Sequence, residues 1–422
     1  MPLLTALLLN ALLLASFGWW LRREYRQAAP GLRGWLLPAL AGRLVLTAFS
    51  ATHPSPDAKY MSFWGAGVTA SFWQHPASLA LWQAPEVRAG GQVLAKYGLS
   101  NTVFFSKLLA LLNLASLGSL AVNALYLSLF CFAGCWLLVR TWGQLFPGTQ
   151  RAAVVALLLW PTVQWWTAGI SKETVLLGSE TALVALVLRH LYGPGRGAAA
   201  GLRDAVAGLV LAWLAFRMRY FFALPLLGGL AALAAVRLAT RRGWLGAGWR
   251  PQVLALLAGL AVGGALAAYV VGRLLPAGFF PQQVVEIYQH GVATSPGRPH
   301  LSYPHLQATA GSLLRHAPLA ILNVFARPWF TDFQGIQYVG VFLENLLLLA
   351  LLLRAAWAAR RGQLRRLPVA LVVVLVLYSV LLAAFIGLST PNFGTLSRYR
   401  AALLPWLLLL AMSAGKNERT SE

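Results

Sequence analysis

Residues 367–388 read LPVALVVVLVLYSVLLAAFIGL, a run of 22 residues without a charged side chain. A helix that crosses a bilayer needs about 20 predominantly apolar residues. The runs Leu3–Leu21 and Val253–Val271 have similar length and composition. Over all 422 residues, 59% are hydrophobic and 11% are charged, whereas soluble domains carry about 25% charged residues. This composition excludes an ordinary soluble enzyme and indicates a polytopic helical membrane protein.

The whole chain is expected to be all-α and to form a single integral membrane domain over residues 1–422. Apolar runs between basic loops predict about eleven transmembrane helices. Their approximate bounds are 3–20, 35–50, 120–138, 152–168, 174–191, 204–216, 220–238, 251–271, 336–353, 367–388 and 400–414.

The basic residues predict the orientation of these spans. Short loops that bear an excess of Lys and Arg stay on the cytoplasmic side. Alternate loops hold 20 of the 34 Lys and Arg residues, including Arg22, Arg23, Arg241, Arg360 and Lys416. We therefore expect the N-terminus outside and the C-terminus in the cytoplasm. The formal net charge of +23 is mostly a topology signal, and no soluble basic domain remains to bind nucleic acid.

Two outer segments are long, at about 51–119 and 272–335, and we expect them to form the active-site face. Each contains an apolar stretch interrupted by polar residues, Leu99–Leu117 and Leu313–Phe325, which predicts a helix lying on the membrane surface. Cys131 and Cys135 lie four residues apart in an apolar run and read as small core residues. No metal-ligand spacing is present among the histidines and cysteines.

A single acidic residue, Asp57, follows the second span on the outer side, in the sequence His53-Pro-Ser-Pro-Asp57. A carboxylate in this position suits a general base that takes a proton from an acceptor hydroxyl. The alternative is a solvated Asp in a turn after proline. Both interpretations remain open from the sequence.

Lys172 and Glu173 occupy a very short outer loop, where a basic residue opposes the usual charge bias. Lys172 is therefore a candidate anion ligand. A purely structural reading has Ser171 capping the next helix, with Glu173 favoured by the helix dipole.

Four arginines lie outside without an acidic neighbour in sequence. Arg217 and Arg219 separate two apolar spans, and Arg398-Tyr399-Arg400 precedes the last one. Guanidinium groups bind phosphate oxygens as a fork. With Lys172, these arginines predict a cationic pocket for a phosphate or pyrophosphate at the outer surface.

Three short motifs together resemble the polyprenyl-phosphate-dependent glycosyltransferases of the glycosyltransferase C superfamily, in particular their poorly characterised bacterial members. They are Asp57 to Tyr60, Trp160 to Glu173 with its Trp-Thr-x-Gly-Ile-x-Lys-Glu pattern, and Asn392 to Arg400 with Asn-Phe-Gly-Thr-Leu-x-Arg-Tyr-Arg. In topology the resemblance covers most of the chain.

The resemblance implies a multi-pass transferase of the bacterial inner membrane. It would move a sugar from a polyprenyl-phosphate carrier to a glycan, lipid or protein acceptor at the outer face, as part of cell-envelope synthesis. Asp57 would be the general base, and the candidate substrate-binding residues would be Lys59, Tyr60, Lys172, Glu173, Arg217, Arg219, Arg398, Tyr399 and Arg400.

The chain departs from the family pattern in its first outer loop. Many members carry paired acids there, whereas Asp57 is followed by Ala58 and Lys59. Either the divalent metal ion that such pairs support is absent, or Lys59 takes over its charge. No other cofactor is implied.

Three other functions stay open from the sequence. A polymerase or ligase acting on lipid-linked glycans would also place arginines outside. A transporter or flippase for a lipid-linked or anionic substrate needs a polar path, yet the charges well inside the spans, away from their ends, are limited to Arg43, Glu180 and Glu344. A structural or assembly protein would have its outer arginines scattered in space.

Overall fold

A computed structural model of the chain describes residues 2–74, 80–95, 100–195, 197–274, 276, 278–333, 335–362 and 366–414. Arg196, Arg365, Lys416 and Arg419 of the inner basic set, and His75, lie outside the described residues.

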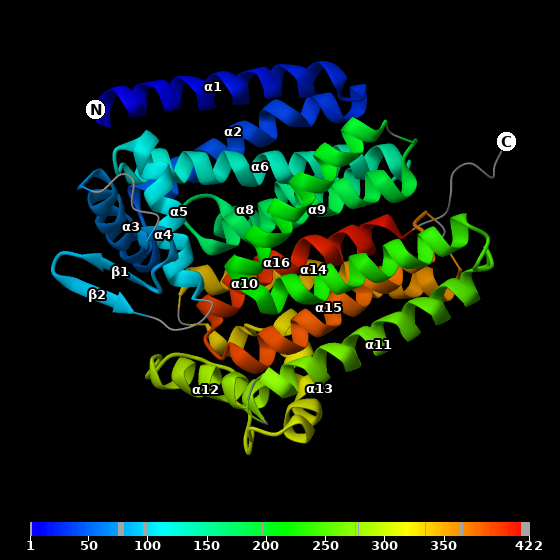
Figure 1. The fold of residues 1–422 in the computed structure, drawn as a ribbon. Coiled ribbons are helices and arrows are strands. Elements are labelled where there is room, and N and C mark those ends of the chain that lie inside the picture. The colour runs from blue at the N-terminus through cyan, green and yellow to red at the C-terminus, as the bar shows by residue number, and fades with distance from the viewer. Residues whose placement is uncertain are drawn as a thin grey trace. The chain divides into compact units, whose positions relative to one another are not determined.

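The described chain is almost entirely helical (Figure 1). Its first part comprises α1 (Pro2–Gln27), α2 (Pro30–Thr52), α3 (Pro56–Gln74), α4 (Ala80–Gln83), β1 (Glu86–Ala89), β2 (Gln92–Ala95), α5 (Asn101–Ser116), α6 (Leu120–Leu145), α7 (Gln150–Val154), a π-helical turn Val155–Leu159, α8 (Pro161–Thr167) and α9 (Lys172–Tyr192). Its second part comprises α10 (Ala198–Arg241), α11 (Trp249–Leu274), α12 (Phe279–Ala293), α13 (Ala310–Ala326), a 3-10 turn Phe330–Asp332, α14 (Ile336–Arg360), α15 (Val369–Ser389) and α16 (Phe393–Ser413).

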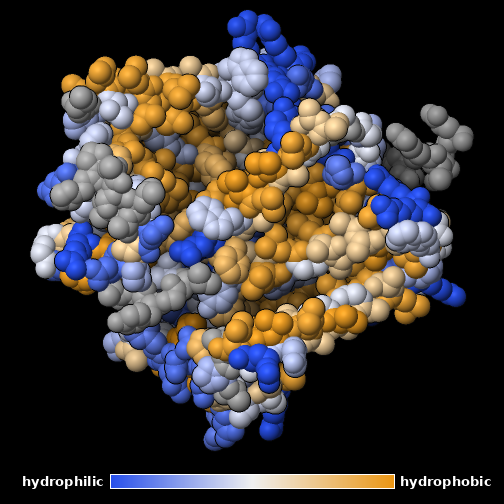
Figure 2. All heavy atoms as spheres, in the orientation of Figure 1, coloured by the Kyte–Doolittle hydropathy of each residue, from blue (hydrophilic) through white to orange (hydrophobic). Residues whose placement is uncertain are grey.

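Eight helices among the described residues are long and apolar enough to cross a membrane: α1, α2, α6, α9, α10, α11, α14 and α15. Figure 2 shows hydrophobic surface along the sides of helices and hydrophilic residues near their ends. The expectation of an all-α fold is confirmed, and the fold fits a multi-pass helical membrane protein.

Four of the eleven expected spans look different in the structure. The segment 152–168 is divided among α7, the π-helical turn and α8, with Pro161 at the first position of α8. The segments 204–216 and 220–238 belong to one helix of 44 residues, α10, broken at Arg219, where the backbone has φ −155° and ψ 87°. The last segment begins earlier than expected, because Asn392 caps α16 and places Arg398 and Arg400 inside the helix.

The chain divides into two compact units. The first comprises Met1–Thr141, Leu157–Leu186 and Arg196–Ala223, and the second comprises Trp142–Ala156, Val187–Gly195 and Leu224–Glu422. The expectation of a single membrane domain stays a prediction.

In the first unit, α6 and α9 approach each other through two glycines. A Cβ atom on Gly134 would lie 2.2 Å from the carbonyl oxygen of Gly178, and one on Gly178 would lie 2.9 Å from the Cα atom of Cys131. Small residues at a helix crossing allow such close backbone contact in membrane proteins.

We expect Gly134→Ala to destabilise the protein by about 1–3 kcal/mol, because its methyl group would meet backbone atoms that no rotamer change can move. Thermal unfolding of the purified protein in detergent would measure the loss. Gly18→Ala in α1 is the matched control: nothing lies within 4 Å of its added Cβ, and replacing a helical glycine by alanine is ordinarily stabilising. A Gly134→Ala variant as stable as this control would contradict the close contact.

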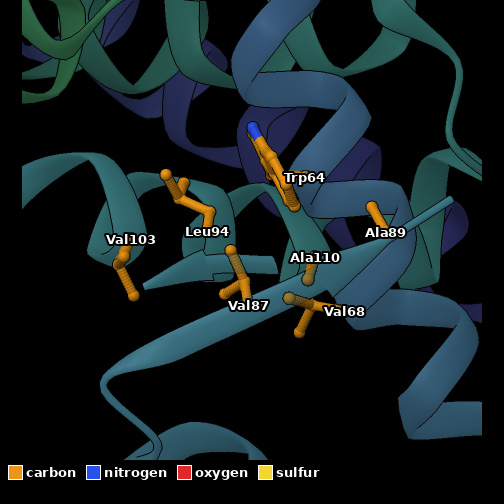
Figure 3. Packing of buried hydrophobic residues seen from close by; sticks show 7 residues of the cluster. All are labelled: Trp64, Val68, Val87, Ala89, Leu94, Val103 and Ala110. Carbon is orange, nitrogen blue, oxygen red and sulfur yellow. The ribbon is translucent and has the colours of Figure 1, made fainter. Parts of the chain in front are cut away.

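A small core joins α3, the β-hairpin and α5 in the first unit. Figure 3 shows its apolar side chains converging from these elements: Trp64, Val68, Val87, Ala89, Leu94, Val103 and Ala110. The strands pair antiparallel, with Val87 opposite Leu94. Gly67 lets β1 approach α3, since a Cβ there would lie 2.1 Å from the carbonyl oxygen of Arg88.

The helices α3 and α5 run parallel. A Cβ on Gly65 would meet Ser106 and Leu109, and one turn later Asn113 donates a hydrogen bond of 3.0 Å to the Thr69 hydroxyl. Asp57 lies eight residues before Gly65, or about 12 Å along the helix axis. The first turn of α3 is therefore at the same end of the helix pair as the first turn of α5.

In the second unit, α15 packs against α11, α12, α13 and α16. Gly387 lies against the carbonyl group of Ala320, at a separation that leaves no room for a Cβ atom. The loop between α12 and α13 is fastened to the start of α16, because Leu301 N donates to Pro391 O over 2.9 Å and Asn392 donates to the Ser295 hydroxyl over 2.7 Å.

Candidate functional site

Lys172 begins α9 in the first unit and is buried, with 8% of its surface exposed. Its ammonium group donates to the Asn101 side-chain oxygen over 2.7 Å and to the Thr102 hydroxyl over 3.0 Å. Ser171 caps this helix by accepting from Thr174 N over 3.1 Å, as the structural reading predicts. The cap directs Lys172 onto the first turn of α5.

A second buried lysine lies one and a half turns further along α5. Lys107 donates to the carbonyl oxygens of Trp82 and Ala84, over 2.9 and 2.6 Å. The pKa of the Lys107 ammonium group is lowered, mainly by its burial and to a smaller extent by the nearby positive charge of Arg217. Arg217 reaches α5 as well, with its guanidinium carbon 4.8 Å from the centre of the Phe104 ring. Its buried Nε atom has no hydrogen-bond partner.

Three cationic side chains from three helices therefore meet along α5: Lys107 of α5 itself, Lys172 of α9 and Arg217 of α10. We call this set the cationic cluster. Sequence reasoning had predicted Lys172 and Arg217 but had treated Lys107 only as an interruption of an apolar stretch. A lysine inside an apolar stretch could have indicated a polar site, because an ammonium group is costly to bury without a partner.

Glu173 and Arg219 form an ion pair beside the cationic cluster. The Arg219 Nε atom donates to the Glu173 carboxylate over 3.0 Å, and its Nη2 atom donates to the same oxygen. Glu173 is fully buried, and 12% of the Arg219 side chain is exposed. Arg219 has no acidic residue nearby in sequence, but in the structure it pairs with Glu173, which lies 46 residues away. Its role as a phosphate ligand stays a prediction.

Asp57, Lys59 and Tyr60 lie in the first turns of α3 and are exposed. The Ser55 hydroxyl caps this helix by accepting from Ala58 N over 3.2 Å. Asp57 thus lies on a helix, where the sequence indicated a loop. The parallel packing of α3 and α5 puts it at the end of the helix pair where Lys172 contacts Asn101.

An apolar pocket of about 340 Å³ opens in the first unit among α1, α5, α6, α9 and α10. Its lining includes Leu108, Val175 and Leu214. Leu108 follows Lys107 directly, Val175 lies three residues after Lys172, and Leu214 lies three residues before Arg217. Residues three apart on a helix share a face, so on α9 and α10 the cationic residue and the pocket residue lie on the same side of the helix. On α5, Leu108 is the residue next to Lys107 and lines the pocket as well.

The remaining candidates belong to the second unit. Arg400 is buried with 1% exposure, and it donates to the Asn345 side-chain oxygen over 2.5 Å and to Arg327 O over 3.4 Å. The hydrogen bond from the Arg400 guanidinium group connects α16 to α14. This bond accounts for the burial of the guanidinium group without a bound phosphate. Arg398 and Tyr399 lie half-buried on the same helix, and their part in a substrate site stays a prediction.

Arg43 is a buried cation whose neighbours are neutral. It donates to the Ser128 hydroxyl over 2.8 Å, to Gln164 over 3.0 Å and to the Thr167 hydroxyl over 2.8 Å. It therefore fastens α2 to α6 and α8. In the described part of the chain, no three His, Cys, Asp or Glu side chains are grouped to hold a metal ion.

No protein-family model matches this chain, and comparisons with curated proteins and with solved structures also give no match.

Proposed function

We propose that this chain is a membrane glycosyltransferase that moves a sugar from a polyprenyl-phosphate carrier to an acceptor at the outer face of the bacterial inner membrane. The observation that carries the proposal is the cationic cluster beside an apolar pocket, both built from α5, α9 and α10. A lipid phosphate complements both features, because its anionic head matches the cationic cluster and its apolar chain matches the apolar pocket.

The proposed topology has the N-terminus outside and the C-terminus in the cytoplasm. Eleven spans result when α10 counts twice across its break at Arg219 and the segments 150–167 and 393–413 are added to the remaining candidate helices. Asp57, Lys172 and Arg217 then all lie at outer ends of spans, and α5 and α13 belong to the two long outer segments.

In the proposed reaction, the bond between the anomeric carbon of the sugar and the carrier phosphate breaks, and the phosphate leaves with the electron pair. The acceptor oxygen forms the new bond to that carbon, and its proton passes to the Asp57 carboxylate. Arg217 and Lys172 stabilise the charge that develops on the departing phosphate. Glu173 and Arg219, already bonded to each other, hold α9 and the break in α10 in place rather than binding the donor.

The proposal is tested by incubating the purified, reconstituted protein with a panel of labelled polyprenyl-phosphate sugars and following transfer of the label to acceptors. We expect a transferred product. Movement of an intact lipid-linked sugar across the bilayer without product would instead identify a flippase. Absence of both activities and of carrier binding would refute the proposal.

Arg217→Gln should weaken binding of a polyprenyl phosphate by about 10- to 100-fold, since a hydrogen bond to a charged group contributes about 1.5–3 kcal/mol. Titration of the purified protein with the carrier alone measures this without any reaction. Arg203→Gln is the control, because it removes an exposed arginine from the same helix. The Arg203 side chain lies close to Asp204. Equal affinity in the two variants would exclude Arg217 from the phosphate site.

A further inference from the structure

The second unit carries a second concentration of positive charge, unrelated to the candidate site. The segments 142–156, 187–195, 237–250 and 354–367 contain eleven arginines, no lysine and no Asp or Glu. The acidic residues described in this unit are Glu286, Asp332 and Glu344, all in other segments.

Contacts connect the described residues of these four segments. Arg237 and Arg241 both donate to Leu191 O, over 3.3 and 2.6 Å. The rings of Tyr192 and Phe146 are 5.9 Å apart. Arg366 donates to Gly148 O over 3.1 Å. These contacts bring the ends of α9 and α10 close to the starts of α7 and α15. We call the surface of the described residues in the four segments, which include the start of α11 and the end of α14, the arginine face.

Three arginines of this face stack on exposed tryptophans. The guanidinium carbons lie 5.0 Å from the Trp244 ring centre for Arg242, 5.5 Å from Trp249 for Arg250, and 3.6 Å from Trp357 for Arg361. The tryptophans are exposed by 74%, 59% and 53%. Tryptophan prefers the level between hydrocarbon and headgroups, so the stacked guanidinium groups are held at headgroup level.

We infer that the arginine face binds the headgroups of anionic phospholipids. A guanidinium fork matches phosphate oxygens, the face carries a single sign of charge, and basic clusters at helix ends recognise anionic lipids. The phospholipid chains would pack beside the tryptophans, so the ligand is a membrane lipid rather than a free anion.

The test is native mass spectrometry of the full chain in a neutral detergent, titrated separately with phosphatidylglycerol and phosphatidylcholine. We expect phosphatidylglycerol to bind at least about tenfold more tightly. The triple variant R242Q/R250Q/R361Q should lose this preference, whereas Arg298→Gln, an exposed arginine in the loop after α12, should retain it. Excess inorganic phosphate should not displace the bound phospholipid.

Equal affinity of the wild-type protein for both lipids would overturn the inference, and so would a preference that survives in the triple variant. Displacement by inorganic phosphate would show a site for free anions instead. Size-exclusion chromatography checks that the variant is folded. If it is not, R242K/R250K/R361K keeps the charges and removes the forks, and an unchanged affinity for phosphatidylglycerol in that variant would overturn the role of the arginines.

Discussion

Sugar transfer by an Asp57→Asn variant is expected to fall by about 10²- to 10⁴-fold, the usual contribution of a positioned general base. Asparagine keeps the size of the side chain and can occupy the same first turn of α3, but its amide takes no proton from an acceptor hydroxyl. The loss should appear in kcat, measured as initial rates of label transfer.

The same variant separates the catalytic role from the structural one. An exposed acid in the first turn of a helix stabilises the fold by about 0.3–1 kcal/mol through the helix dipole, so a purely structural Asp57 would change stability slightly and leave the transfer rate intact. Carrier binding should stay near the wild-type value. Glu86→Gln, which removes an acid paired with Arg88 in the neighbouring hairpin, is the control. Full activity of Asp57→Asn would remove this residue from the mechanism.

The second large effect is on stability. Glu173→Ala should destabilise the protein by about 3–5 kcal/mol, because it leaves the largely buried Arg219 guanidinium without the carboxylate that balances it. Thermal unfolding and the yield of folded protein after purification both report this loss. Carrier binding should be lost only in proportion to the unfolded fraction.

A double variant tests the pairing itself. Glu173→Ala combined with Arg219→Leu removes both charges, and replacing a buried ion pair by apolar groups is often neutral. We expect the double variant to recover most of the stability lost in Glu173→Ala. Strictly additive effects of the two substitutions would show that the residues do not interact energetically.

The sequence predicted the helices well because a membrane requires long apolar runs, and such runs are visible residue by residue. It predicted α9, and the Ser171 cap was one of the two interpretations that the sequence left open, because a cap depends on local residues. It predicted two spans separated by Arg217 and Arg219, whereas the structure has one helix, α10, with a break at Arg219.

The candidate site could be predicted only in part. Lys172 and Arg217 were visible as charges in unexpected places, whereas their arrangement along α5 depends on packing between residues far apart in sequence. The same is true of the bonds from Glu173 to Arg219 and from Arg400 to Asn345. The apolar pocket could not be predicted from the sequence, because a leucine that lines a cavity cannot be distinguished there from a leucine that faces lipid.

The contact of Gly134 with Gly178 fixes how closely α9 lies against α6, because a side chain at either glycine would overlap atoms of the other helix. Lys172 begins the helix that carries Gly178. Arg217, by contrast, stands two residues before the break in α10. If a carrier binds as proposed, Lys172 would therefore contact it from a helix whose distance from α6 is fixed by two glycines, whereas Arg217 would contact it from the last turn before a break in its helix.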